Sequence, residues 1–92
     1  MTYKAMAARV PRTEDTFTMG KTRTIRQRNG VVSTMTQAVR NDGFIRREVS
    51  IFANGARVDM IADHIKPGMT TRLSGKYSQN NVFVAFDVVN AC

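Results

Sequence analysis

Two stretches in the middle of the chain alternate apolar and polar residues with the period of a β-strand. In Phe44–Ala53 the aliphatic face consists of Ile45, Val49, Ile51 and Ala53. Thr70–Tyr77 alternates in the same way and has a basic outer row. A strand with one aliphatic face is half-buried, so we expect the opposite face of each strand to meet solvent.

Between these strands, apolar residues recur at the spacing of a short amphipathic helix. The stripe comprises Val58, Ile61, Ala62 and Ile65. Asn54 can cap the start of this helix, and Pro67-Gly68 can end it. Because so short a helix is marginal in water, we expect it to close an apolar opening in the sheet.

Upstream, Tyr3–Val10 is predicted as a first strand that ends at Pro11. Residues 11–20 are turn-forming, polar and acidic without a sustained period, and this pattern predicts a loop. Phe17 and Met19 lie in that loop, where they either pack under the sheet or reach a ligand.

A basic hairpin follows the predicted loop. Asn29-Gly30 is the strongest hairpin signal in the chain, and it joins the basic run Lys21–Arg28 to a returning strand, Val31–Val39. In that strand Gln37 falls where we expect an inward-facing apolar residue, which a subunit contact would explain. Arg40–Gly43 is a second tight connection, leading into Phe44.

The last strand, Val82–Val89, has an apolar row on one face that consists of Val82, Val84, Phe86 and Val88. A helix between the third and fourth of five strands is typical of the OB-fold, an all-β Greek-key barrel. A chain of 92 residues has the size of one domain, so we predict a single OB-fold domain over residues 1–92.

Charge narrows the choice of partner. The chain has 14 Lys and Arg against 7 Asp and Glu, a net charge of +7. A field of that sign on so small a body favours a polyanion, with nucleic acid first and an acidic membrane second. Ten of the 14 basic residues are arginine, which both clamps phosphate and stacks on bases, so the balance favours nucleic acid.

The sequence lacks the groups that catalysis requires. Its only histidine, His64, and its only cysteine, Cys92, cannot build a zinc site or an internal disulfide, and no phosphate-binding or dinucleotide motif is present. We therefore expect no enzyme activity, no cofactor and no metal. No long apolar run or signal-peptide core is present, which predicts a cytoplasmic protein that does not enter a membrane.

Three segments, Arg23–Ala38, Val49–Phe52 and His64–Tyr77, resemble successive parts of the bacterial and phage single-stranded DNA-binding proteins. These parts are the approach to the second strand, a strand that ends in Phe, and a turn followed by a strand that ends in Gly-basic. The resemblance implies that Phe52 stacks on a base. It further implies phosphate contacts from Arg23, Arg26 and Arg28.

The chain departs from that family in three ways. It has no tryptophan, and Arg46 stands where the family keeps a stacking Trp. The connection Arg40–Gly43 is short, and no acidic tail follows the last strand. A compact member of phage or plasmid type, or a small primosomal OB protein, fits this pattern best.

We therefore predict sequence-tolerant binding of single-stranded DNA, in replication, recombination or repair, by a homodimer or homotetramer. The predicted binding residues are Lys21, Arg23, Arg26, Arg28, Phe44, Arg46, Phe52, Arg72, Lys76 and Tyr77. Two alternatives stay open. Phe44 and Phe52 can instead form a subunit or partner interface, which would make the chain an assembly module, and the strand can be RNA.

Overall fold

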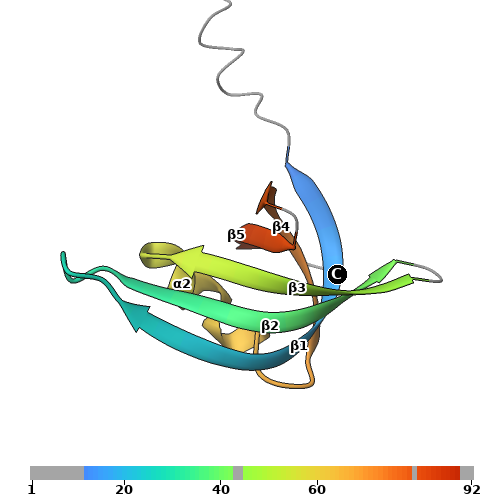
Figure 1. Ribbon diagram of the computed structural model, residues 1–92, viewed down its shortest axis with the longest axis horizontal. Helices are drawn as coiled ribbons and strands as arrows, with labels where there is room; N and C mark the ends of the chain where they lie inside the picture. Colours follow the sequence, from blue (N-terminus) through green and yellow to red (C-terminus); the bar gives the residue numbers. More distant parts are fainter. Residues whose placement is uncertain (1–11, 43–44, 80, 90–92) are drawn as a thin grey trace, which may run out of the picture.

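In the computed structural model of the protein, the residues described are 12–42, 45–79 and 81–89. Five strands form a closed barrel in the order β1-β2-β3-β5-β4, in which β4 pairs back onto β1 (Figure 1). The strands are β1 Thr13–Arg26, β2 Val32–Asp42, β3 Ile45–Asn54, β4 Thr70–Gln79 and β5 Val82–Val88. A short helix, α2 (Ala56–Ile61), and a 3₁₀ turn, η1 (Ala62–His64), lie between β3 and β4. This arrangement confirms the predicted OB-like barrel.

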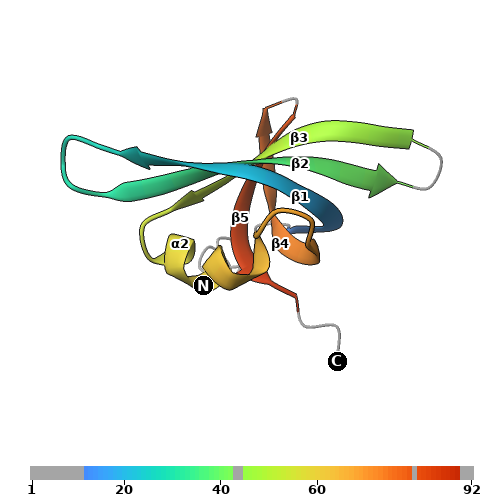
Figure 2. The same ribbon diagram turned by 90° about the horizontal axis from the view of Figure 1, so that it is seen from below.

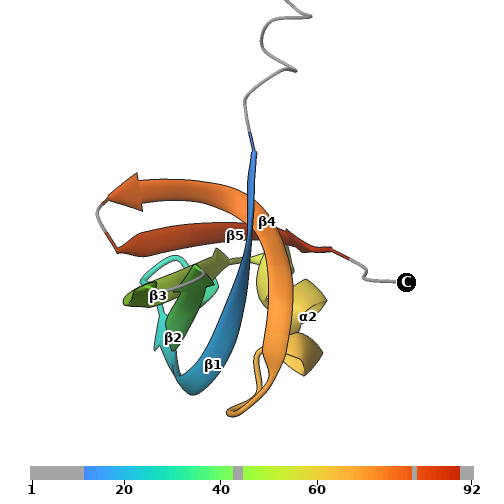
Figure 3. The ribbon, with the colours of Figure 1, turned by 90° about the vertical axis from the view of Figure 1, so that its right-hand side faces the viewer.

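Strands β1, β2 and β3 form one curved layer whose two ends extend past the rest of the barrel (Figure 2). β5 and β4 follow β3 around the barrel, and α2 lies beside them (Figure 3). All neighbouring strands are antiparallel except β3 and β5, whose parallel ladder joins only Ser50–Phe52 to Val82–Val84. No helix in the described ranges is long and apolar enough to cross a membrane.

The core is small and mostly aliphatic, and it includes two aromatic rings that contact each other at a tilt. Its largest fully buried apolar side chains are Phe17, Phe83, Ile51, Ile61 and Leu73. The rings of Phe17 and Phe83 lie 5.0 Å apart. Ile61 of α2 and the following Ile65 are buried in the same cluster, so the helix closes the barrel as predicted.

The prediction of a loop over residues 11–20 is wrong from Thr13 onward. These residues form the first half of β1, where Phe17 and Met19 are 0% and 3% exposed and belong to the core. The register shifts between Met19 and Thr22, so the inward positions change from odd to even numbers along β1. This bulge breaks the alternation that a sequence pattern needs. A side chain at Gly20 would come within 2.9 Å of the Gln37 carbonyl oxygen, which explains the glycine there.

The faces of β2 and β5 differ from a simple alternation, and in β2 the expected inward position is wrong. In β2 the inward residues are Thr34, Thr36 and Ala38, while Gln37 is exposed, so its position needs no subunit contact. Burial of Thr36 is tolerated because its hydroxyl group hydrogen-bonds with that of Thr22 at 2.8 Å. In β5 the core residues are Phe83 and Ala85; of the predicted apolar row, Val82, Val84 and Phe86 are half-buried between or beside them, whereas Val88 lies beyond a register shift and packs against the core.

The predicted helix cap is also wrong. Gly55 precedes α2, and no side chain caps the helix. Asn54 instead accepts a hydrogen bond from the Ser33 hydroxyl at 2.7 Å, which ties β3 to β2. The predicted strand Tyr3–Val10 lies outside the described residues.

Candidate nucleic-acid interface

Cross-strand pairing brings five residues into one line on the outside of the barrel. Directly opposed residues of neighbouring strands project to the same face of a sheet. The line runs through the pairs Arg23↔Met35, Met35↔Phe52, Phe52↔Val84 and Val84↔Lys76, and so crosses every strand. We call Arg23, Met35, Phe52, Val84 and Lys76 the outer row.

The outer row is apolar in its middle and cationic at both ends. Phe52 lies between the buried residues Ile51 and Ala53, so its own half-buried ring points outward. Met35 and Val84, on either side of it, are half-buried as well, while Arg23 and Lys76 are exposed. Among the described residues, no carboxylate lies within ion-pair distance of either cation. The row therefore offers an apolar platform between two cations.

Lys21 extends the cationic end of the row on β1. A surface recess of about 330 Å³ lies there, lined by Lys21, Thr22, Arg23, Met35, Gln37 and Ser50. Four predicted site residues therefore lie on or beside the outer row, namely Lys21, Arg23, Phe52 and Lys76. Lys21 is exposed, and its ammonium group adds a third cation beside the platform.

Other predicted site residues lie away from the row. Arg26 follows the even-numbered positions of β1 that face the helix side, and Arg28 lies in the exposed β1–β2 turn. Arg46 shares the outer face of β3 but lies six residues from Phe52, roughly 20 Å along an extended strand. Phe44 falls outside the described residues.

Arg72 lies on the outer surface of β4, where it forms an ion pair with an acidic side chain. Its Nε donates to the Glu14 carboxylate at 3.3 Å, and its guanidinium also reaches the Thr16 hydroxyl at 3.5 Å. The charge of Arg72 is therefore already offset by Glu14. The structure separates this residue from the uncompensated cations of the outer row.

A second outward phenylalanine provides a contrast with Phe52. The Phe86 ring lies 5.2 Å from the Arg12 guanidinium and 4.5 Å from that of Arg57. These cation–π contacts occupy the ring. Within the described residues, Phe52 has no such cationic partner, so no guanidinium covers its ring.

Tyr77 does not join the outer row. Its ring packs edge-on against buried Phe83 at 5.0 Å, and its hydroxyl donates to the Asp15 carboxylate at 2.7 Å. Burial first, and then the hydrogen bond to Asp15, raises the pKa of Tyr77 to about 12. The Arg40 guanidinium lies 5.7 Å from the ring centre and 3.5 Å from Asp15. Tyr77 thus belongs to a polar network at the end of the barrel.

Sequence reasoning missed Met35 and Val84, the two apolar neighbours of Phe52. Their alternation signal exists, since each lies between two buried residues. Met35 is hidden because its inward neighbours are threonines, and Val84 because the outward face of β5 is as apolar as its inward face.

Compared with protein-family models and with curated proteins, the chain matches none.

Proposed function

We propose that this barrel binds single-stranded DNA without catalysis and largely without regard to sequence. The bases would stack over Phe52, Met35 and Val84 while the phosphates meet the cations at the two ends. Such a protein would act in the cytoplasm wherever replication, recombination or repair exposes a single strand, and it would need no cofactor.

One observation carries the proposal: a half-buried phenylalanine lies outward between two half-buried apolar residues, and each end of the line holds a cation that no described carboxylate pairs with. Stacking on an aromatic ring tolerates every base because every base has a π-face. The outer surface of strands 2 and 3 is also where OB-folds in general hold oligonucleotides. The net charge of +7 supports attraction of a polyanion.

Replacement of Phe52 by alanine tests the proposal. Loss of one stacked base costs about 1–3 kcal/mol, so affinity for a labelled homopolymer should fall roughly 5- to 150-fold. Phe86→Ala is the matched control, because that ring is already covered by Arg12 and Arg57. Fluorescence anisotropy measures both affinities. Equal losses in the two variants, or none in Phe52→Ala, would reject stacking on the outer row.

A second candidate function is an assembly module. β3 extends over ten residues, but its ladder with β5 joins only three of them. The part of β3 from Arg46 to Val49 is therefore an edge to which another strand can add. Sedimentation of Glu48→Pro separates the candidates: the Ser50 N–H points to the β5 side, and proline removes the Glu48 N–H of the same edge, so a dissociated oligomer with unchanged affinity favours assembly. A separate titration of the protein with single-stranded DNA, single-stranded RNA and duplex compares the three affinities. Tightest binding of RNA would make RNA the preferred ligand.

A further inference from the structure

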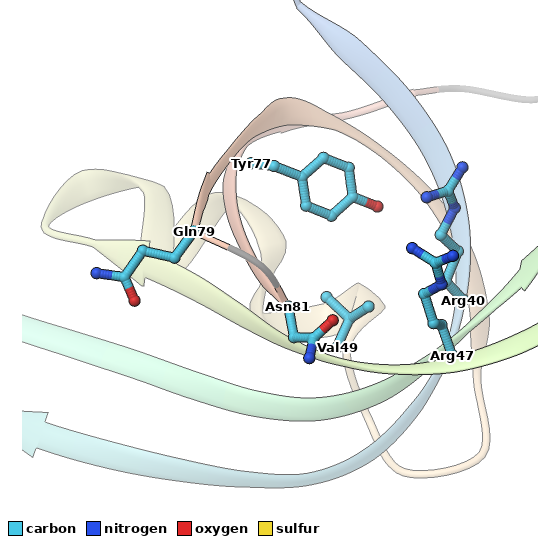
Figure 4. A pocket seen from close by; sticks show the side chains of 6 residues that line it. All are labelled: Arg40, Arg47, Val49, Tyr77, Gln79 and Asn81. Carbon is cyan, nitrogen blue, oxygen red and sulfur yellow. The ribbon is translucent and has the colours of Figure 1, made fainter.

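A recess of about 540 Å³ lies between the paired strands β2 and β3 on one side and the end of β4 and start of β5 on the other. It is separate from the outer row. It is lined by Arg40, Arg47, Val49, Tyr77, Gln79 and Asn81. In Figure 4 the Tyr77 ring forms one side, Val49 and Asn81 lie opposite, and both guanidinium groups are at one end. The Gln79 amide points away from the centre.

The charges at that end of the recess favour an anion. Arg40 and Arg47 are directly opposed in the β2–β3 ladder, and like charges in that relation destabilise a sheet. Asp15 pairs with Arg40 at 3.5 Å, whereas no described carboxylate lies within ion-pair distance of Arg47. Arg47 therefore brings to this end of the recess a positive charge that no described carboxylate pairs with. A bound anion would relieve the repulsion between the two guanidiniums.

The remaining walls favour a flat, partly apolar group. Val49 is only 4% exposed and provides an apolar floor. The Tyr77 ring is held in place by Phe83 on one side and by its hydrogen bond to Asp15. Asn81 adds an exposed amide, which can both donate and accept hydrogen bonds.

We propose that this recess holds the terminal nucleotide of a bound strand, with its phosphate at Arg47 and Arg40 and its base between Tyr77 and Val49. The inference rests on the proposed binding of single strands. A terminal phosphate monoester carries a charge of about −1.5 to −2 at neutral pH and has three acceptor oxygens. Two adjacent guanidinium groups bind a terminal phosphate better than they bind an internal phosphodiester. Each guanidinium can then hydrogen-bond to different oxygens of the terminal phosphate.

The test compares one oligonucleotide with a 5′-phosphate, a 3′-phosphate or neither. Wild-type protein should bind one phosphorylated form about tenfold more tightly than the unphosphorylated form. Arg47→Gln should abolish that preference and leave the unphosphorylated oligonucleotide bound as before. Arg46→Gln is the matched control, since it removes the same charge from the adjacent position on the opposite face of β3. An equal affinity of wild-type protein for all three forms would overturn the proposal.

Free ligands test the recess apart from the strand. Nucleoside monophosphate should shift the NMR signals of the Val49 methyl groups and the Asn81 side chain more than nucleoside or inorganic phosphate does. If it does so while no oligonucleotide binds, the single-strand function fails and the ligand class of the recess stands. If oligonucleotides bind and nucleoside monophosphate shifts neither residue, the terminal site fails and the single-strand function stands.

Discussion

Removal of one cation from the outer row should change the salt dependence of binding by a countable amount. Arg23, Lys21 beside it, and Lys76 have no carboxylate partner among the described residues. Each can therefore release a counterion from a bound nucleic-acid strand. With a slope of about −0.7 per phosphate contact, three contacts give a log–log slope of about −2.1. In Arg23→Gln the slope should become about −1.4.

Anisotropy titrations of a homopolymer across a tenfold range of salt measure these slopes. Over that range the wild-type affinity should fall about 125-fold and that of Arg23→Gln about 25-fold. Arg72→Gln is the control, because Glu14 already offsets the Arg72 charge at 3.3 Å. Its slope should match that of wild type. A flat wild-type slope, or an equal change in both variants, would refute the assignment of phosphate contacts to the outer row.

Two further predictions concern the barrel itself. A methyl group at Gly75 would overlap the Val84 carbonyl oxygen. Gly75→Ala should therefore lower the free energy of unfolding by at least about 3 kcal/mol and Tm by roughly 12–24 °C. A fall of less than about 4 °C in thermal circular dichroism would contradict this. Tyr77 should ionise near pH 12, so stability is complete below pH 10, where the unfolded chain keeps its proton, and falls as pH rises towards 12. An absorbance titration of Tyr3→Phe, in which only Tyr77 reports, measures that midpoint, and a value near 10 would disprove the burial argument.

The fold was predictable from β3, α2 and β4 because their apolar faces keep a regular period. Val49, Ile51 and Ala53 are buried as the alternation requires. The first strand was not predictable, because the bulge at Gly20 changes the phase of alternation halfway along it. Predictions of inward and outward faces failed where buried hydroxyls replace aliphatic groups, as at Thr36, since a composition pattern does not show a hydrogen-bond partner.

The candidate site was predictable only in part, and for a related reason. Phe52 and Arg23 stand out in the sequence as an outward ring and a member of a basic run. Their direct connection through Met35 depends on strand register, which spacing along the chain does not reveal. Arg72 and Tyr77 have suitable chemistry for the site, but Glu14 and Asp15, which are distant in sequence, engage them.

The short parallel ladder between β3 and β5 makes this junction, which we call the seam, a weakly paired part of the barrel. Three residue pairs close it, whereas ten join β2 to β3, so transient opening should begin there. The outer row crosses this seam at Phe52 and Val84. A polymer bound along the outer row would therefore contact both β3 and β5. Its binding would stabilise the closed form of the barrel.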